Sequence, residues 1–224
     1  MAFASPVPAQ ESARRYVDQM AARVSTPLVL GGHSKGGNLA VYAAAKASPQ
    51  MAVRVVAAYD HDGPGFPEGV LSQAELDRVR PLVRKTVPQE SLVGLLMESD
   101  VGYRVVKSAG HGIGQHSPFL WEIEDGAAVE ADGLAPSARL TAEVLNEWIA
   151  GMGLLERRRA VDALFEALRA SGAKDAFDVL MGGPKAIGLL VDAARNTRPE
   201  AREVIVAQMK ALAAIAAKKA FFGR

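Results

Sequence analysis

The pentapeptide Gly-His-Ser-Lys-Gly at positions 32–36 constrains the fold of this chain more than any other stretch. It follows the apolar run Leu28–Leu30 and precedes Leu39–Lys46, an alanine-rich segment that contains neither glycine nor proline. The first segment is typical of a parallel strand covered on both faces, and the second favours a helix. The order of strand, glycine-rich turn and helix predicts a sharp strand-to-helix turn that carries Ser34.

The pattern Gly-x-Ser-x-Gly is the nucleophile elbow of α/β-hydrolases when a strand precedes it and a helix follows it. In such a turn we expect a β-carbon at Gly32 or at Gly36 to collide across the turn. The Ser34 hydroxyl would project from the top of the sheet, and the Lys35 backbone amide would point to where an oxyanion could form. The alternatives are a loop that only joins strand to helix, or one that holds a phosphate. Neither the Walker pattern nor Gly-x-Gly-x-x-Gly is present.

A second β-rich run at positions 51–59 makes the region a βαβ unit, so its two strands should be parallel. Asp60, His61 and Asp62 follow this strand, at the end of the sheet where catalytic and ligand-binding groups gather. Asp62 is therefore a candidate triad acid, although Asp-Gly-Pro-Gly is also a turn signal. Further strands are expected at 85–87 and 103–108. A helix is expected from Ser72, with Glu75 completing a capping box.

Two histidines lie on the loop at 109–118, after the last predicted strand. An α/β-hydrolase keeps its general base on such a loop, and the chain order Ser, Asp, His is the order of that fold. His116 is favoured over His111 because Pro118 and the apolar residues 119–121 can fix its position, whereas glycines flank His111. His33, inside the elbow, is expected to be packed or hydrogen-bonded rather than to act as a base.

Composition excludes several classes of function. The net charge of +1 gives no argument for nucleic acid, and the absence of cysteine excludes disulfides and thiolate chemistry. No signal peptide and no membrane-spanning run are recognised, and no metal or cofactor is implied. We expect a cytoplasmic protein that acts on a small-molecule ester or lipid.

The character of the sequence changes near Ser137. An α/β core is expected over residues 1–136 and a helical C-terminal segment over 137–224, where apolar residues recur at helical spacing. An amphipathic helix is also expected near residues 8–24, with its apolar face listed as Ala13, Tyr16, Val17, Met20 and Val24.

These motifs together resemble the Mbeg-like family, a domain family of unknown function in the α/β-hydrolase superfamily that is distantly similar to the class three lipases. The matching segments are 32–40, 62–66, 88–94 with Ser91, 105–108, 115–121 and the helical region around 156–173. The resemblance implies a lipase-like fold with Ser34 as nucleophile and His116 as base. Asp62 ranks first as the triad acid and Glu90 second, since class three lipases take theirs from the stretch matching 89–91. Ser117 stands where an acidic residue is usual.

A larger departure concerns the beginning of the fold. Only about two dozen residues precede Leu28, whereas several strands and a loop with the second oxyanion donor precede the elbow in related folds. We therefore expect either a fragment of a longer product or an exposed strand edge that another molecule covers.

Two functions follow. The first is a serine hydrolase of the esterase or lipase type, of weak activity at best if one oxyanion donor is missing. The alternative is a non-catalytic hydrolase-like scaffold that binds a protein partner or forms a homo-oligomer through an exposed sheet edge. Nucleotide binding at the glycine turn has only the helix N-terminus in its favour.

Overall fold

The structure is a computed structural model that describes residues 7–97, 101–170 and 197–222. The chain forms two compact units, residues 1–111 with 115–138 and residues 112–114 with 139–224.

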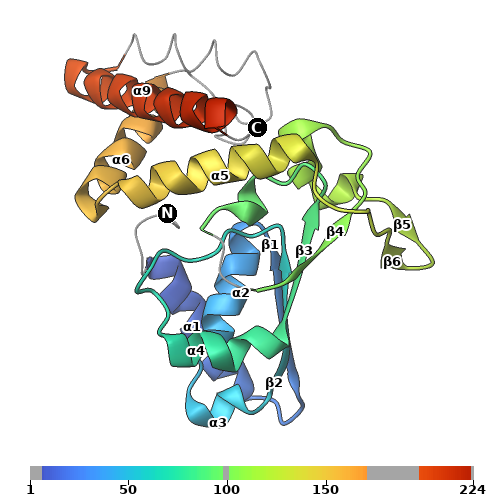
Figure 1. The fold of residues 1–224 in the computed structure, drawn as a ribbon. Helices are drawn as coiled ribbons and strands as arrows, with labels where there is room; N and C mark the ends of the chain where they lie inside the picture. The colour runs from blue at the N-terminus through green and yellow to red at the C-terminus, as the bar shows by residue number, and fades with distance from the viewer. Residues whose placement is uncertain (1–6, 98–100, 171–196, 223–224) are drawn as a thin grey trace. The chain divides into compact units, whose positions relative to one another are not determined.

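The first unit is built on a parallel sheet (Figure 1). Its strands are β1 (Leu28–His33), β2 (Val55–His61), β3 (Val83–Pro88) and β4 (Tyr103–Val106), adjacent in the order β1-β2-β3-β4. All three pairings are parallel, so the predicted α/β class and the parallel βαβ unit are confirmed. The carboxyl ends of β1, β2 and β3 consequently meet at one edge of the sheet.

Four helices accompany these strands: α1 (Pro8–Ala21), α2 (Lys35–Lys46), α3 (Pro49–Ala52) and α4 (Gln73–Val79). The capping box before α4 is confirmed, because Ser72 Oγ accepts from the Glu75 amide and the Glu75 carboxylate accepts from the Ser72 amide. The second strand begins later than predicted, since Pro49 starts the short helix α3 instead.

Shorter elements complete the first unit. The 3₁₀ turns are η1 (Arg80–Leu82), η2 (Val93–Leu95), η3 (Gly112–His116) and η4 (Pro118–Leu120). The strands β5 (Ile123–Glu124) and β6 (Ala127–Ala128) form a small antiparallel hairpin.

Helices α1, α2 and α4 lie on one side of the sheet, where the core forms (Figure 1). Buried side chains of α2 pack there with residues of β2, β3 and α4 in one hydrophobic cluster. Its buried members are Val41, Tyr42, Ala44, Ala45, Val55, Ala58, Leu71, Val79, Val83 and Val101.

The opposite face of the sheet corrects one prediction. Leu28–Leu30 was expected to be covered on both faces, yet Val29 is 60% exposed and Tyr59 on β2 is 42% exposed. Helices α1, α2 and α4 lie on the other side of the sheet, so they do not cover this face.

β1 is also an edge strand of the sheet among the described residues. At the other edge, the segment 129–131 pairs with β4. The Lys107 amide donates to Val129 O and the Ala131 amide to Val105 O, both at 2.9 Å.

The buried face of α1 also differs from the prediction. Val17 is buried as predicted, but Tyr16 is exposed and Val24 lies beyond the end of the helix. The other buried side chains are Gln10 and Ala21. Gln10 turns inward because its amide donates to Asn38 Oδ1 at 3.0 Å. A buried hydrogen bond between two amides therefore sets the rotation of α1, which a count of apolar residues cannot reveal.

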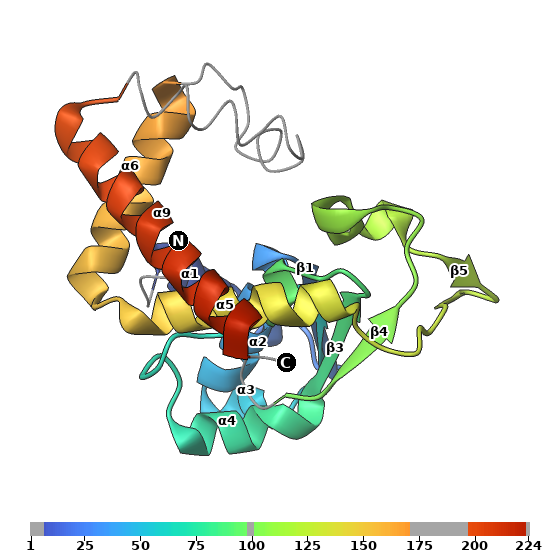
Figure 2. The same cartoon turned by 45° about the horizontal axis from the view of Figure 1, so that its top comes forward.

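The second unit contains the helices α6 (Leu154–Ala170) and α9 (Pro199–Phe222) and most of α5 (Pro136–Gly151). Helices α6 and α9 pack against each other (Figure 2). Gln208 on α9 accepts from Trp148 Nε1 on α5 and donates to Glu156 on α6. The helical character predicted after residue 137 is confirmed for these elements, and residues 171–196 lie outside the described part.

The two glycines of the elbow are not equivalent, contrary to the expectation that both forbid a side chain. A β-carbon at Gly32 would lie 2.3 Å from the backbone carbon of Gly36, whereas one at Gly36 would meet nothing within 4 Å. The close approach is made by the backbone of Gly36, so a side chain there points away from the turn.

We therefore predict opposite outcomes for two alanine substitutions. Gly32→Ala should lower the free energy of unfolding by at least about 3 kcal/mol, because two backbones must separate. Gly36→Ala should leave it within about 1 kcal/mol and can raise it, because position 36 lies in the first turn of α2. Urea denaturation followed by circular dichroism measures both. Equal losses for the two variants would contradict the asymmetry.

Candidate active site

Ser34 lies in a strained turn between β1 and α2. Its backbone dihedral angles, φ 56° and ψ −124°, place a residue with a side chain in a region that few such residues occupy. The Ser34 amide donates to His61 O at 2.9 Å, and the Ser34 carbonyl accepts from the amides of Gly37 and Asn38 at 3.0 and 3.3 Å. The strain is thus maintained by bonds on both sides. The Lys35 amide precedes these two and belongs to the helix start, where amides have no partner in a preceding turn.

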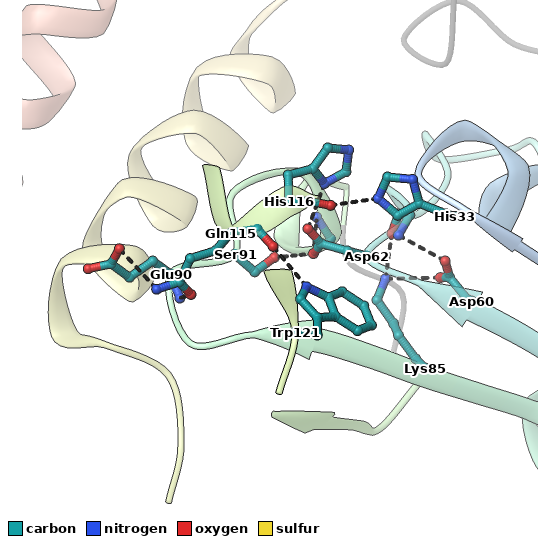
Figure 3. A network of polar contacts seen from close by, with 11 residues as sticks. His33, Asp60, Asp62, Lys85, Glu90, Ser91, Gln115, His116 and Trp121 are labelled. Carbon is teal, nitrogen blue, oxygen red and sulfur yellow. Dashed lines mark hydrogen bonds and ion pairs between the residues drawn. The ribbon is translucent and has the colours of Figure 1, made fainter. Parts of the chain in front are cut away.

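Asp62 follows β2 and is fully buried, with 0% of its surface exposed and φ at 53°. Its amide donates to Thr86 O on β3 at 2.7 Å. One carboxylate oxygen, Oδ1, accepts from Ser91 Oγ at 2.5 Å and from the Gly94 amide at 3.1 Å. The other oxygen, Oδ2, lies 2.7 Å from His116 Nδ1 (Figure 3). Every hydrogen bond of this carboxylate is to a group that can donate.

His116 ends η3 and is only 6% exposed. Because Asp62 accepts at Nδ1, that nitrogen carries the proton, and Nε2 is left as the basic nitrogen of the neutral ring. The chain before it is held by Gln115, whose carbonyl accepts from Trp121 Nε1 at 2.8 Å and whose side chain accepts from the Glu90 amide at 2.9 Å (Figure 3). The position of the imidazole is therefore fixed from two directions.

The residues weighed as alternatives lie elsewhere. His111 is exposed on the loop. The Glu90 carboxylate accepts from Gln115 Nε2 at 3.2 Å, so its partner is the residue that precedes the histidine. The carboxylate that meets the His116 ring is that of Asp62. Phe119 is 96% exposed, so it is Trp121 that anchors the histidine loop, and not the whole apolar run at 119–121.

His33 is hydrogen-bonded within the site, as its place in the elbow predicts. Its Nε2 lies 2.6 Å from the backbone carbonyl of His116, and the two imidazole centroids are 4.5 Å apart. Burial is the main cause that lowers the pKa of His33, and the hydrogen bond to the His116 carbonyl opposes it. The sequence pattern singled out the histidine but not its partner, which comes from a loop 83 residues away.

A buried ion pair that the sequence analysis missed supports the turn after Asp62. Lys85 Nζ lies 3.3 Å from Asp60 Oδ2 and donates to Gly63 O at 2.8 Å, and both side chains are 5% exposed. The Gly63 amide donates to Asp60 Oδ1 at 2.9 Å. Burial raises the pKa of Asp60, and Lys85 opposes that effect. The available signal was a lysine within the strand predicted at 85–87, since lysine is rarely buried without a partner.

Other kinds of site find little support in the described part of the chain. Its acidic residues and histidines form no group of three or more that could hold a metal ion. None of its helices is both long enough and apolar enough to span a membrane.

With this geometry in view, a comparison with protein families matches the Mbeg1-like family over residues 1–166. The chain belongs to the Mbeg1-like family. The match includes the elbow, Asp62 and the His116 loop. No curated protein and no solved structure matches this Mbeg1-like chain.

The ion pair yields a prediction for stability. Lys85→Met should lower the free energy of unfolding by about 3 kcal/mol, because the Asp60 carboxylate stays buried without its cation. The deficit should shrink as the pH falls, because a folded-state pKa raised above its unfolded value favours folding once the carboxyl is protonated.

Urea denaturation of Lys85→Met and of Lys85→Met/Asp60→Asn between pH 4 and pH 8 measures this effect. The double variant should recover part of the loss and lack the pH dependence. A deficit that is the same at both ends of this range would show that the pair contributes packing rather than charge.

Proposed function

We propose that this Mbeg1-like protein is a serine hydrolase of the esterase or lipase type, built on an α/β-hydrolase-like fold. The observation that carries the proposal is the 2.7 Å contact between His116 Nδ1 and the buried Asp62 carboxylate. The serine held at φ 56° follows His33, whose ring centroid lies 4.5 Å from that of His116. The acid leaves His116 Nε2 free to accept a proton. A strained serine after a parallel strand and before a helix supplies the nucleophile of this class.

In the proposed reaction Ser34 Oγ attacks the carbonyl carbon of an ester, and its proton passes to His116 Nε2. The bond to the alcohol oxygen then breaks, and the alcohol leaves with the proton from His116. Water attacks the acyl-serine in a second step, with His116 as base again, and the carboxylic acid is released. Asp62 stays ionised and stabilises the transient imidazolium.

The proposed oxyanion donor is the Lys35 backbone amide, at the positive end of α2. This donor matters for the rate, because removal of one oxyanion donor typically costs about 10²–10³ in rate. The acylation of Ser34 by an activated reagent is the step that tests the nucleophile most directly. Ester or lipid substrates without strong charge suit a chain with net charge +1.

A fluorophosphonate probe tests this function directly. Ser34 Oγ should form a bond to phosphorus as the phosphorus–fluorine bond breaks, with fluoride leaving and the serine proton passing to His116. The intact mass should rise by one adduct in the wild type and not in Ser34→Ala. A wild type that gains no Ser34 adduct would refute the catalytic proposal.

Two matched pairs of variants locate the base and the acid. His116→Gln should abolish labelling while His111→Gln, at an exposed loop position, should not change it. Asp62→Asn should reduce labelling far more than Glu90→Gln, because an amide at position 62 favours the wrong tautomer of His116. The reverse ranking in the second pair would assign the acid to Glu90.

A second candidate function has its own observation. The β1 edge is uncharged over Leu28–His33, and Val29 beside it is exposed, whereas natural sheets usually protect such edges with charges or covering segments. We propose that a second copy of this chain occupies it, because antiparallel pairing of two β1 strands about a twofold axis joins two identical uncharged edges.

Analytical ultracentrifugation of the wild type and of Val29→Lys tests this dimer. The wild type should sediment as a dimer, and Val29→Lys should shift it toward the monomer without changing its circular dichroism spectrum. A wild type that stays monomeric at high concentration would refute the pairing, and Ser34→Ala should have no effect on it.

A further inference from the structure

His33, the residue immediately before Ser34, makes a hydrogen bond with the loop that carries His116. His33 Nε2 lies 2.6 Å from the carbonyl oxygen of His116, which is the backbone of the residue proposed as the base. This bond joins the end of β1 to a loop that follows β4 in the sequence, across the carboxyl ends of the strands (Figure 3).

We propose that His33 is a positioning residue, whose Nε2–H fixes the backbone of His116 and thereby the distance between its ring and Ser34. The inference rests on the proposed hydrolase function. It extends that function, because the Ser-His-Asp assignment needs no role for a second imidazole.

The chemistry of the partner defines the tautomer of His33. A backbone carbonyl can only accept, so Nε2 must carry the proton. The same nitrogen would donate in the protonated ring as well, but a charge there would lie 4.5 Å, centroid to centroid, from the ring that must become cationic during acylation. A neutral His33 therefore serves the reaction better than a charged one.

Several groups that face His33 act on its pKa. The bond to the His116 carbonyl and the Asp62 charge raise the pKa, the His116 ring lowers it, and His61 lies beside His33 in the β1–β2 register. Burial lowers the pKa of His33 and also that of His61. Burial therefore favours the neutral form of both rings, in agreement with the Nε2–H tautomer that the bond to the His116 carbonyl requires of His33.

A rigid side chain at position 33 suits the bond to the His116 carbonyl. An imidazole has two side-chain torsions, and its backbone is fixed by the β1–β2 ladder, which pairs His33 with His61. The donor therefore stands at a nearly constant place next to the elbow. The loop that carries His116 is anchored by Trp121 and Gln115 on its other side, so His33 supplies the contact that faces the nucleophile.

Two substitutions separate the donor from the ring. His33→Gln keeps an N–H donor of similar reach, and His33→Phe keeps a ring without the donor. With the fluorophosphonate probe, His33→Phe should label about 10²-fold more slowly than the wild type, the cost of a misplaced catalytic group. His33→Gln should recover most of the rate, because it restores a donor to the His116 carbonyl. If His33 were itself the base, His33→Gln would label no faster than His116→Gln.

A spectroscopic measurement separates this inference from the proposed function. The His116 Nδ1 proton, bonded to Asp62, should give a low-field proton resonance in the wild type and in His33→Gln. In His33→Phe it should broaden or move upfield. This readout needs no chemistry at Ser34, so it still decides the role of His33 if the wild type does not label.

Urea denaturation of each variant completes the test. If His33→Phe proves unfolded, His33→Asn takes its place, because its donor is too short to reach the carbonyl. The proposal would be overturned if a folded variant without the donor labelled at the wild-type rate and kept the His116 Nδ1 proton resonance at its wild-type position.

Discussion

The Asp62 carboxylate is the interaction on which the rest of the site depends. A fully buried anion must be stabilised by donors, and its two oxygens receive Ser91 Oγ, the Gly94 amide and His116 Nδ1. These donors come from two different segments after β3 and β4, so one desolvated charge joins them to the end of β2. The ion pair of Asp60 with Lys85 also stabilises the turn after β2, because Lys85 donates to the Gly63 carbonyl. The fold thus concentrates its buried polar groups at the carboxyl ends of three strands.

Much of this was predictable from local sequence. The elbow, the parallel βαβ unit, the capping box at Ser72 and the approximate strand positions all depend on residues close to one another in the chain. Such signals survive in a single sequence because the same few residues specify the turn, the cap or the strand. The pairing of His116 with Asp62 was proposed only through the known order of a fold, and spacing alone left Glu90 open.

What could not be predicted depends on contacts between distant segments. The rotation of α1 follows from the Gln10–Asn38 bond, and the support of the site follows from Lys85 meeting Asp60. The exposure of Val29 depends on which face of the sheet the helices cover, which an apolar run cannot reveal. The mistaken symmetry of Gly32 and Gly36 has a similar origin, because only the direction of each β-carbon distinguishes them.

The loop that carries His116 leaves and rejoins the sheet at nearly the same place. The Ala109 amide donates to Leu120 O at 2.8 Å and the Glu122 amide to Lys107 O at 3.0 Å, so the two ends of the loop are bonded to each other. The entropy of closing a loop grows only slowly with its length. Residues can therefore be inserted into or removed from this loop without moving β4. A change in the length of this loop can therefore alter the surroundings of the imidazole while the strands keep their register.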